Sequence, residues 1–136
     1  MSAIHFVLSA ICIGVANTVI EWFFYGFAFH KYQALTPQTW RPENYSSYTY
    51  STILSFLFGT LFTLFYVKIG AKYVLPSNIL SDCKLALICF ACFSVITELN
   101  NAIYINYNRM FVVGKLISSS LCFIAAAIIA GLFYWP

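Results

Sequence analysis

Charged residues are scarce in this chain of 136 residues: they make up 8% of it, and only four are acidic. Soluble globular domains carry about a quarter of their residues as Asp, Glu, Lys or Arg, so this composition excludes an ordinary water-exposed fold. Hydrophobic residues instead make up 62% of the chain, and aromatic residues 20%. We therefore expect an integral membrane protein whose main partner is the lipid bilayer.

Motifs for catalysis and cofactor binding are also missing. The sequence has no nucleophile motif, no phosphate-binding loop and no dinucleotide fingerprint. Its two histidines, His5 and His30, lie about 37 Å apart along one predicted helix and so cannot share a metal ion. The basic residues form no run, which disfavours nucleic acid as a partner. We expect no catalytic residues, no metal and no cofactor.

Long apolar runs fill most of the chain. A helix needs about 20 apolar residues to cross the ~30 Å hydrocarbon core of a bilayer. Four such segments are predicted near residues 4–29, 48–70, 85–107 and 112–134. The predicted fold is all-α: a single transmembrane domain over residues 1–136, with four helices in a compact antiparallel bundle and both termini on one side. Ser81 or Asp82 is expected to cap the third helix.

The orientation of the bundle is weakly encoded. Three basic residues flank the spans on one side and four on the other: Lys68, Lys72 and Lys84 against Lys31, Arg41, Arg109 and Lys115. The positive-inside rule acts on this difference of one charge and favours termini on the outside. A dual orientation, or one set by a partner, remains open.

Small residues recur at helical spacing within the spans. Such residues let helix backbones approach closely in lipid, where no hydrophobic effect draws helices together. The expected packing positions are Gly14 in the first span, Gly59 in the second, and Gly114, Ser118, Cys122, Ala126 and Ala130 in the fourth.

Two glutamates interrupt the apolar segments. A charged side chain at the centre of a bilayer costs roughly 2.5–3.5 kcal/mol on insertion scales, so Glu21 and Glu98 are expected to face the protein interior or a wet cavity. Glu21 precedes Lys31 by ten residues and Glu98 precedes Arg109 by eleven. At 1.5 Å per residue, both carboxylates would lie about 15 Å below the same interface.

Other polar residues fall on the same helix faces as the glutamates. Asn17, Thr18 and Tyr25 share an arc with Glu21, and Ala91, Ser94, Asn101 and Ala102 share one with Glu98. Two carboxylates at one depth do not easily both ionise, so a shared proton is expected. In the structural alternative both are neutral and hold the bundle in register through hydrogen bonds to Asn17, Asn101 or Tyr25.

Cys89 and Cys92 form a C-x-x-C pair inside an apolar helix body. A redox pair needs surroundings in which a thiolate can form, usually at a helix end. The position of this pair therefore favours a structural role.

The end of the first span reads Phe24-Tyr25-Gly26-Phe27-Ala28-Phe29-His30-Lys31-Tyr32. This segment resembles the aromatic-Tyr-Gly-x-x-Phe-x-Lys segment of the DUF1761 family of small four-span bacterial membrane proteins. The Trp and Pro of that pattern are replaced here by Phe24 and Phe27. The resemblance implies a four-span architecture in a bacterial inner (cell) membrane and carries over no site residues, because the family has no established activity.

The sequence therefore favours a transporter or channel-like protein with a proton- or cation-linked polar site at mid-membrane. The residues of that site would be Glu21, Glu98, Asn17, Asn101, Tyr25 and Thr18, and its ligand a proton or a small cation. The alternative is a non-catalytic assembly subunit of a larger membrane complex. A transporter or channel-like protein would form a homo-oligomer, whereas an assembly subunit would bind unlike membrane subunits. A membrane enzyme is the third hypothesis.

Overall fold

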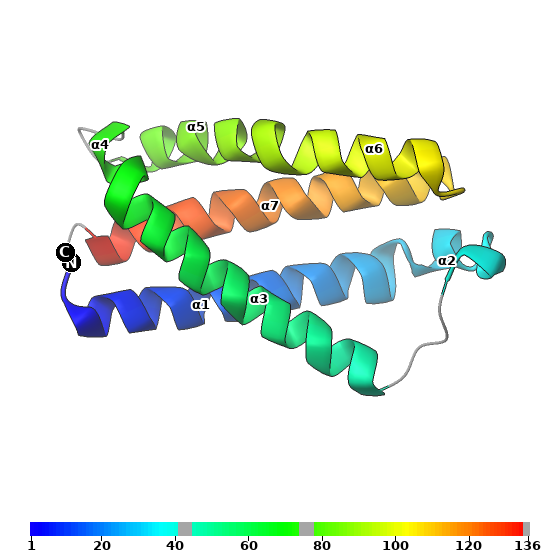
Figure 1. Cartoon of the computed structure of the whole chain (residues 1–136), viewed down its shortest axis with the longest axis horizontal. Helices are drawn as coiled ribbons and strands as arrows, with labels where there is room; N and C mark the ends of the chain where they lie inside the picture. Colours follow the sequence, from blue (N-terminus) through cyan, green and yellow to red (C-terminus); the bar gives the residue numbers. More distant parts are fainter. Residues whose placement is uncertain (41–44, 74–77, 135–136) are drawn as a thin grey trace.

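The computed structural model describes residues 1–40, 45–73 and 78–134, and these ranges contain helices and no strand. Four helical stretches are long and apolar enough to cross a membrane: Ala3–Ala28, Tyr45–Gly70, Ile79–Tyr104 and Arg109–Tyr134. They run in alternating directions, and the two termini lie side by side at one end of the molecule (Figure 1). The prediction of an all-α membrane protein with four packed transmembrane helices is confirmed.

Three of the four spans contain a π-helical turn. The first span consists of α1 (Ala3–Glu21) and η1 (Trp22–Ala28). The second consists of α3 (Tyr45–Phe65) and η3 (Tyr66–Gly70), and the short helix α4 (Ala71–Tyr73) follows it. The third consists of α5 (Ile79–Cys89), η4 (Phe90–Val95) and α6 (Ile96–Tyr104). The fourth span is the uninterrupted α7 (Arg109–Tyr134), and between the first two spans lie α2 (His30–Gln33) and the 3-10 turn η2 (Pro37–Thr39).

The third span begins earlier than predicted, at Ile79 and not near residue 85. Its N-cap is Asn78, whose side-chain oxygen accepts a hydrogen bond of 2.8 Å from the backbone N–H of Ser81. The prediction that Ser81 or Asp82 caps this helix is therefore wrong. Asp82 lies inside the helix and is buried.

The four spans form a row that closes near the termini, where the second span contacts the third through Tyr66 and Asp82. The helix α1 packs against α3 on one side and α7 on the other, and α7 also packs against α5. In Figure 1, α3 crosses α1 obliquely. Gly59 lies at this crossing, where an added Cβ would be 2.9 Å from the backbone nitrogen of Gly14 and closer still to the carbonyl oxygen of Ala10. Only a glycine at position 59 allows the two backbones to come this close.

Small residues also form the inner face of α7. All five residues of the predicted packing stripe are buried: Gly114, Ser118, Cys122, Ala126 and Ala130. Gly114 lies against the ring of Phe29, with only 2.5 Å between the ring and an added Cβ. Gly14 is likewise covered by Phe56, at 2.6 Å from an added Cβ.

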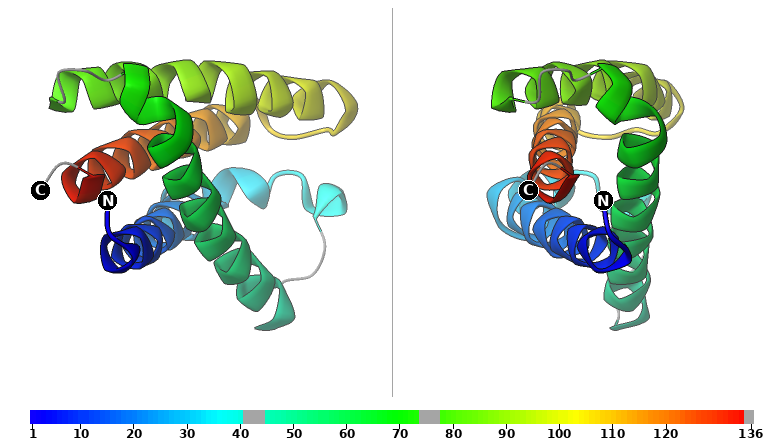
Figure 2. Two further views of the ribbon diagram at one scale, coloured as in Figure 1. Left: turned by 60° about the vertical axis from the view of Figure 1, so that its left-hand side comes forward. Right: turned by 90° about the vertical axis from the view of Figure 1, so that its left-hand side faces the viewer.

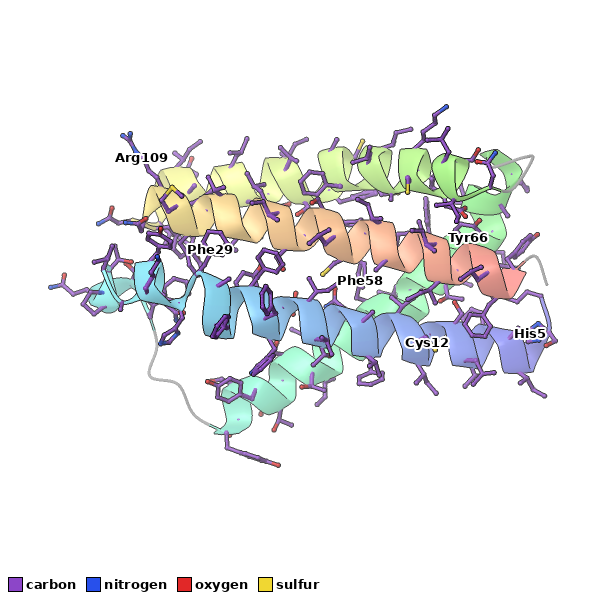
Figure 3. All side chains as sticks on the ribbon, turned by 180° about the vertical axis from the view of Figure 1, so that it is seen from behind. His5, Cys12, Phe29, Phe58, Tyr66 and Arg109 are labelled. Carbon is purple, nitrogen blue, oxygen red and sulfur yellow. The ribbon has the colours of Figure 1, made fainter. Side chains whose placement is uncertain are left out.

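The apolar core lies toward the end of the bundle that holds the termini, and we name this half the closed end. Its buried members include Ile13, Phe62, Tyr66, Leu85, Cys89 and Ala126. At the opposite half, the open end, the start of α3 slants away from α6, as both views in Figure 2 show. Figure 3 labels Tyr66 at the closed end and Phe29 toward the open end.

Candidate functional site

A cavity of about 650 Å³ lies between the helices at the open end, and we name it the inner cavity. The first span contributes Asn17, Glu21 and Tyr25 to its wall, and the third contributes Ser94 and Glu98. The two glutamates therefore face one space, although they come from helices that are not neighbours in the row.

The glutamates also share a level along the bundle. Glu21 lies seven residues before the end of its span at Ala28, and Glu98 lies six before Tyr104. At 1.5 Å per residue both lie about 10 Å inside the open end of their helices, compared with roughly 20 Å to the middle of a 26-residue span. The shared level agrees with the prediction. Measured along the helices, however, the two glutamates lie nearer the open end than the middle of their spans, because the helices end before the flanking charges.

Glu21 is surrounded by polar groups of α1 and α3. The amide of Asn17 donates a hydrogen bond of 2.9 Å to the hydroxyl of Ser55, and the Glu21 carboxyl lies beside both side chains. Lys115 is close enough to act on this carboxyl electrostatically, but Glu21 forms no ion pair within the described residues. Asn17 and Ser55 thus fix one side of a carboxyl whose other side faces the cavity.

Glu98 forms an ion pair with Lys115 of α7. The two side chains are each 16% exposed, and the Lys115 ammonium also lies 5.1 Å from the centre of the Tyr107 ring. Sequence reasoning counted Lys115 as an interfacial charge and missed it as a site residue. Its position six residues after Arg109 places it about 9 Å inside α7, at the level of the glutamates, and this depth is the signal that was overlooked.

The remaining predicted site residues are placed differently. The Thr18 hydroxyl donates 2.9 Å to the carbonyl of Gly14 and lines a second, neighbouring cavity. Tyr25 lines both cavities, and its ring lies 5.8 Å from that of Phe111. Asn101 is half-buried on α6 and lines neither of these two cavities. Asn101 follows Glu98 by three residues on the same helix, but the structure does not place it in the wall of either cavity.

The π-helical turns lie next to the polar residues. Such turns are rare and occur frequently at functional sites. Glu21 directly precedes η1, Glu98 follows η4 by three residues, and η3 begins at Tyr66. Because η4 changes the helix phase, Ala91 is exposed and does not share the inward face of Glu98, contrary to the prediction from regular 100° spacing.

The second cavity measures about 480 Å³ and extends from Glu21 toward α2 and η2. We name it the aromatic cavity, because five aromatic residues line it: Trp22, Tyr25, Trp40, Tyr48 and Phe111. It shares Glu21, Tyr25, Ser47 and Ser51 with the inner cavity. Sequence reasoning missed Trp22 and Trp40 as site residues, because Trp is common at membrane interfaces, where its amphipathic ring lies at the level of the headgroups.

A third carboxylate lies buried at the closed end. The hydroxyl of Tyr66, which is fully buried, donates a hydrogen bond of 2.6 Å to Asp82 Oδ1. Gly131 packs against the same carboxyl, whose Oδ2 would be 2.5 Å from an added Cβ. Neither pattern nor spacing marks this pair in the sequence.

The cysteines are all free. Cys89 is buried in the closed-end core, whereas Cys92 is exposed on the outer face of η4, so the two thiols of the C-x-x-C pair lie in different surroundings. Within the described ranges, no group of three His, Cys, Asp or Glu residues is arranged to hold a metal ion.

Comparisons with protein-family models, with curated proteins and with solved structures found no match to this chain. The resemblance to DUF1761 therefore stays a prediction, and the function has to be argued from the site itself.

Proposed function

We propose that this chain is a small transporter or channel-like protein of the bacterial inner membrane, with a proton- or cation-linked site formed by Glu21 and Glu98. The observation that carries the proposal is their placement: two carboxylates from separate helices line one cavity of about 650 Å³ at the same level of the bundle. A purely structural carboxylate would be enclosed by partners, as Asp82 is.

The two glutamates have different roles in this proposal. Glu98 is neutralised by Lys115, so Glu21 is the carboxylate able to bind a proton or a cation from the cavity. Because both ligands compete for one carboxylate, release of the proton favours binding of the cation, and the two are exchanged. Asn17 and Ser55 hold the Glu21 side chain in place during the exchange.

The closed end supplies the barrier that a carrier needs. There the Ser9 and Thr63 hydroxyls share a hydrogen bond of 3.2 Å, and the apolar core fills the space between the helices. Transport requires this end to open when the other closes, so the two ends alternate in giving access to Glu21.

The assembly-subunit alternative is favoured by one observation. In the third span 17% of the most apolar stretch is buried, compared with 28–33% in the other three spans. Exposed residues on its outer face include Ile88, Ile96 and Ile103. This face suits a partner subunit or a second copy of the chain as well as it suits lipid. Purification separates these cases: a subunit co-purifies with unlike chains, and a carrier is isolated as a monomer or homo-oligomer.

The proposal is tested by proton flux in liposomes. The purified chain is reconstituted in potassium buffer without organic cations, a pH gradient is applied, and an enclosed dye reports the internal pH. Glu21→Gln preserves the size of the side chain but removes its titration, so we expect the Gln variant to fold and to lose the flux. Thr60→Val, on the exposed face of α3, is the matched control and should behave as the unaltered chain. Equal flux in the Glu21→Gln variant and the unaltered chain would refute the proposal.

A further inference from the structure

The aromatic cavity differs from the inner cavity in its lining. Its volume of about 480 Å³ is within the 300–1,000 Å³ typical of sites for organic ligands, and far exceeds the space that a bare inorganic ion needs. Trp22, Tyr25, Trp40 and Tyr48 contribute aromatic rings around this space, and Glu21 contributes a carboxylate.

Part of the aromatic wall is held in place before any ligand arrives. The Trp40 indole N–H donates 3.3 Å to the Thr36 hydroxyl, and its ring meets Phe111 edge-on with 4.8 Å between ring centres. Tyr107 adds a further ring contact to Trp40 at 5.3 Å. A pre-ordered ring loses little conformational freedom when a ligand binds.

Among the residues that the structure describes, the charges around the aromatic cavity leave one carboxylate, that of Glu21, without an ion-pair partner. Lys115 lines the same cavity but is paired with Glu98 on the far side. Glu21 has no such pair among the described residues. The described wall is therefore matched by a ligand with a single positive charge.

We propose that the aromatic cavity binds a monovalent organic ammonium ion, with its alkyl groups against the rings of Trp22 and Trp40 and its charge beside Glu21. This inference rests on the proposed function and names an organic class of cation that Glu21 takes in addition to the potassium ion of the flux assay. Aromatic faces attract cations through the ring quadrupole, and they do so best when the cation is weakly hydrated, as an alkylammonium ion is. Ca²⁺ and Mg²⁺ ions instead take six or more oxygen ligands, which an aromatic wall does not supply.

The experiment measures binding of radiolabelled tetraethylammonium to the purified full-length chain in a maltoside detergent. Its neutral counterpart of similar shape, 3-ethylpentan-3-ol, is added as a competitor. We expect saturable binding that the alcohol does not displace. Glu21→Gln should weaken binding at least tenfold, because the alkylammonium loses its counter-charge. Circular dichroism confirms that each variant is folded.

A matched pair of variants tests the aromatic contribution. Trp22 is 66% exposed, so replacing it leaves the bundle core untouched. Trp22→Leu removes the ring and should weaken tetraethylammonium binding by roughly fivefold. Trp22→Phe preserves an aromatic face, so its affinity for tetraethylammonium should lie within about twofold of that of the unaltered chain.

An alkylammonium group is carried both by free amines and by the choline headgroup of a lipid, and competition distinguishes the two sources. Displacement of the label by diheptanoylphosphatidylcholine at lower concentration than by choline assigns the site to a lipid headgroup. The reverse order assigns it to a free ion, and both results support an ammonium site.

Three results would overturn the inference. They are the absence of saturable tetraethylammonium binding, displacement of the label by the alcohol as effective as that by unlabelled tetraethylammonium, and the same affinity for tetraethylammonium in the Glu21→Gln variant and the unaltered chain. None of them refutes the proposed function, because the flux assay contains no organic cation. Conversely, Glu21-dependent binding of tetraethylammonium together with Glu21-independent proton flux would leave the ammonium site standing and refute proton-linked transport.

Discussion

The closed and open ends of the bundle each contain carboxylates within membrane-spanning helices, but their surroundings are opposite. Asp82 at the closed end is buried, accepts a hydrogen bond of 2.6 Å from Tyr66 and is covered by Gly131. Glu21 and Glu98 at the open end face a cavity of about 650 Å³. The same chemical group is a packing element at one end and lines a cavity at the other.

The difference between the ends follows from the size of the residues at the helix contacts. Glycine and alanine at the closed end let the backbones meet, as Gly59 does against Ala10. At the open end α3 diverges from α6, and aromatic side chains surround the space that is left. Close backbone contact at one end therefore sets the splay that creates the cavities at the other.

The largest effect is expected from Gly59→Ala. The added methyl group would overlap the backbone of α1, which cannot move aside as a flexible side chain can. We expect the variant to lose about 3 kcal/mol of unfolding free energy or to fail to fold. Thermal unfolding followed by circular dichroism in detergent measures the loss.

Gly26→Ala is the matched control at the open end. Its added methyl group would meet only the ring of Trp22, at an ordinary 3.5 Å, and should leave the unfolding temperature nearly unchanged. Equal losses in the two glycine variants would contradict the contrast between a tightly packed end and an open one.

An intermediate effect is expected at the Tyr66–Asp82 pair. Tyr66→Phe removes the donor and leaves a buried carboxyl group without this partner, which costs about 2 kcal/mol. A double-mutant cycle with Asp82→Ala, which removes the acceptor, measures the interaction. We expect a coupling energy of at least about 1 kcal/mol. A coupling of zero would show that the hydrogen bond does not hold the closed end together.

The smallest effect on stability is expected from breaking the ion pair at the open end. Lys115→Met removes the ammonium that pairs with Glu98, and both side chains are partly exposed. An accessible pair contributes about 1 kcal/mol or less, whereas removing one partner of a dry, buried pair costs roughly 3–5 kcal/mol. The free energy of unfolding of the Lys115→Met variant therefore reports whether water reaches the ion pair. A loss above about 3 kcal/mol would indicate that the pair is buried away from water and would contradict an open site.

Much of the fold was predictable because bilayer thickness fixes the length of each span and small residues mark the contacts between helices. The number of spans and the inward placement of the Gly114–Ala130 stripe follow from these two rules. The early start of the third span was not predictable, because Asp82 and Lys84 look like residues outside a membrane helix. Asp82 is tolerated there because Tyr66, sixteen residues earlier, donates a hydrogen bond to it.

The candidate site was predictable in part. Asn17, Glu21 and Tyr25 line one cavity, as their shared helical arc predicts: Asn17 and Glu21 lie one turn apart in the regular helix α1, and Tyr25 follows early in η1. The placement of Ala91 failed because the π-turn η4 shifts the helix phase, and no sequence pattern announces such a turn. The role of Lys115 depends on the relative level of two helices, which a single sequence fixes only coarsely.

Chemical accessibility along α3 tests the central claim, an open polar site above a closed end, most directly. In a cysteine-free background, Ser51→Cys places a thiol in the wall of both cavities, and Thr63→Cys places one at a fully buried position of the same helix. Each variant is reconstituted in liposomes and treated with a membrane-impermeant methanethiosulfonate carrying a trimethylammonium group. We predict rapid modification of the Ser51→Cys variant and none of the Thr63→Cys variant. Equal reactivity at the two positions, or no reaction at Ser51→Cys, would contradict the account.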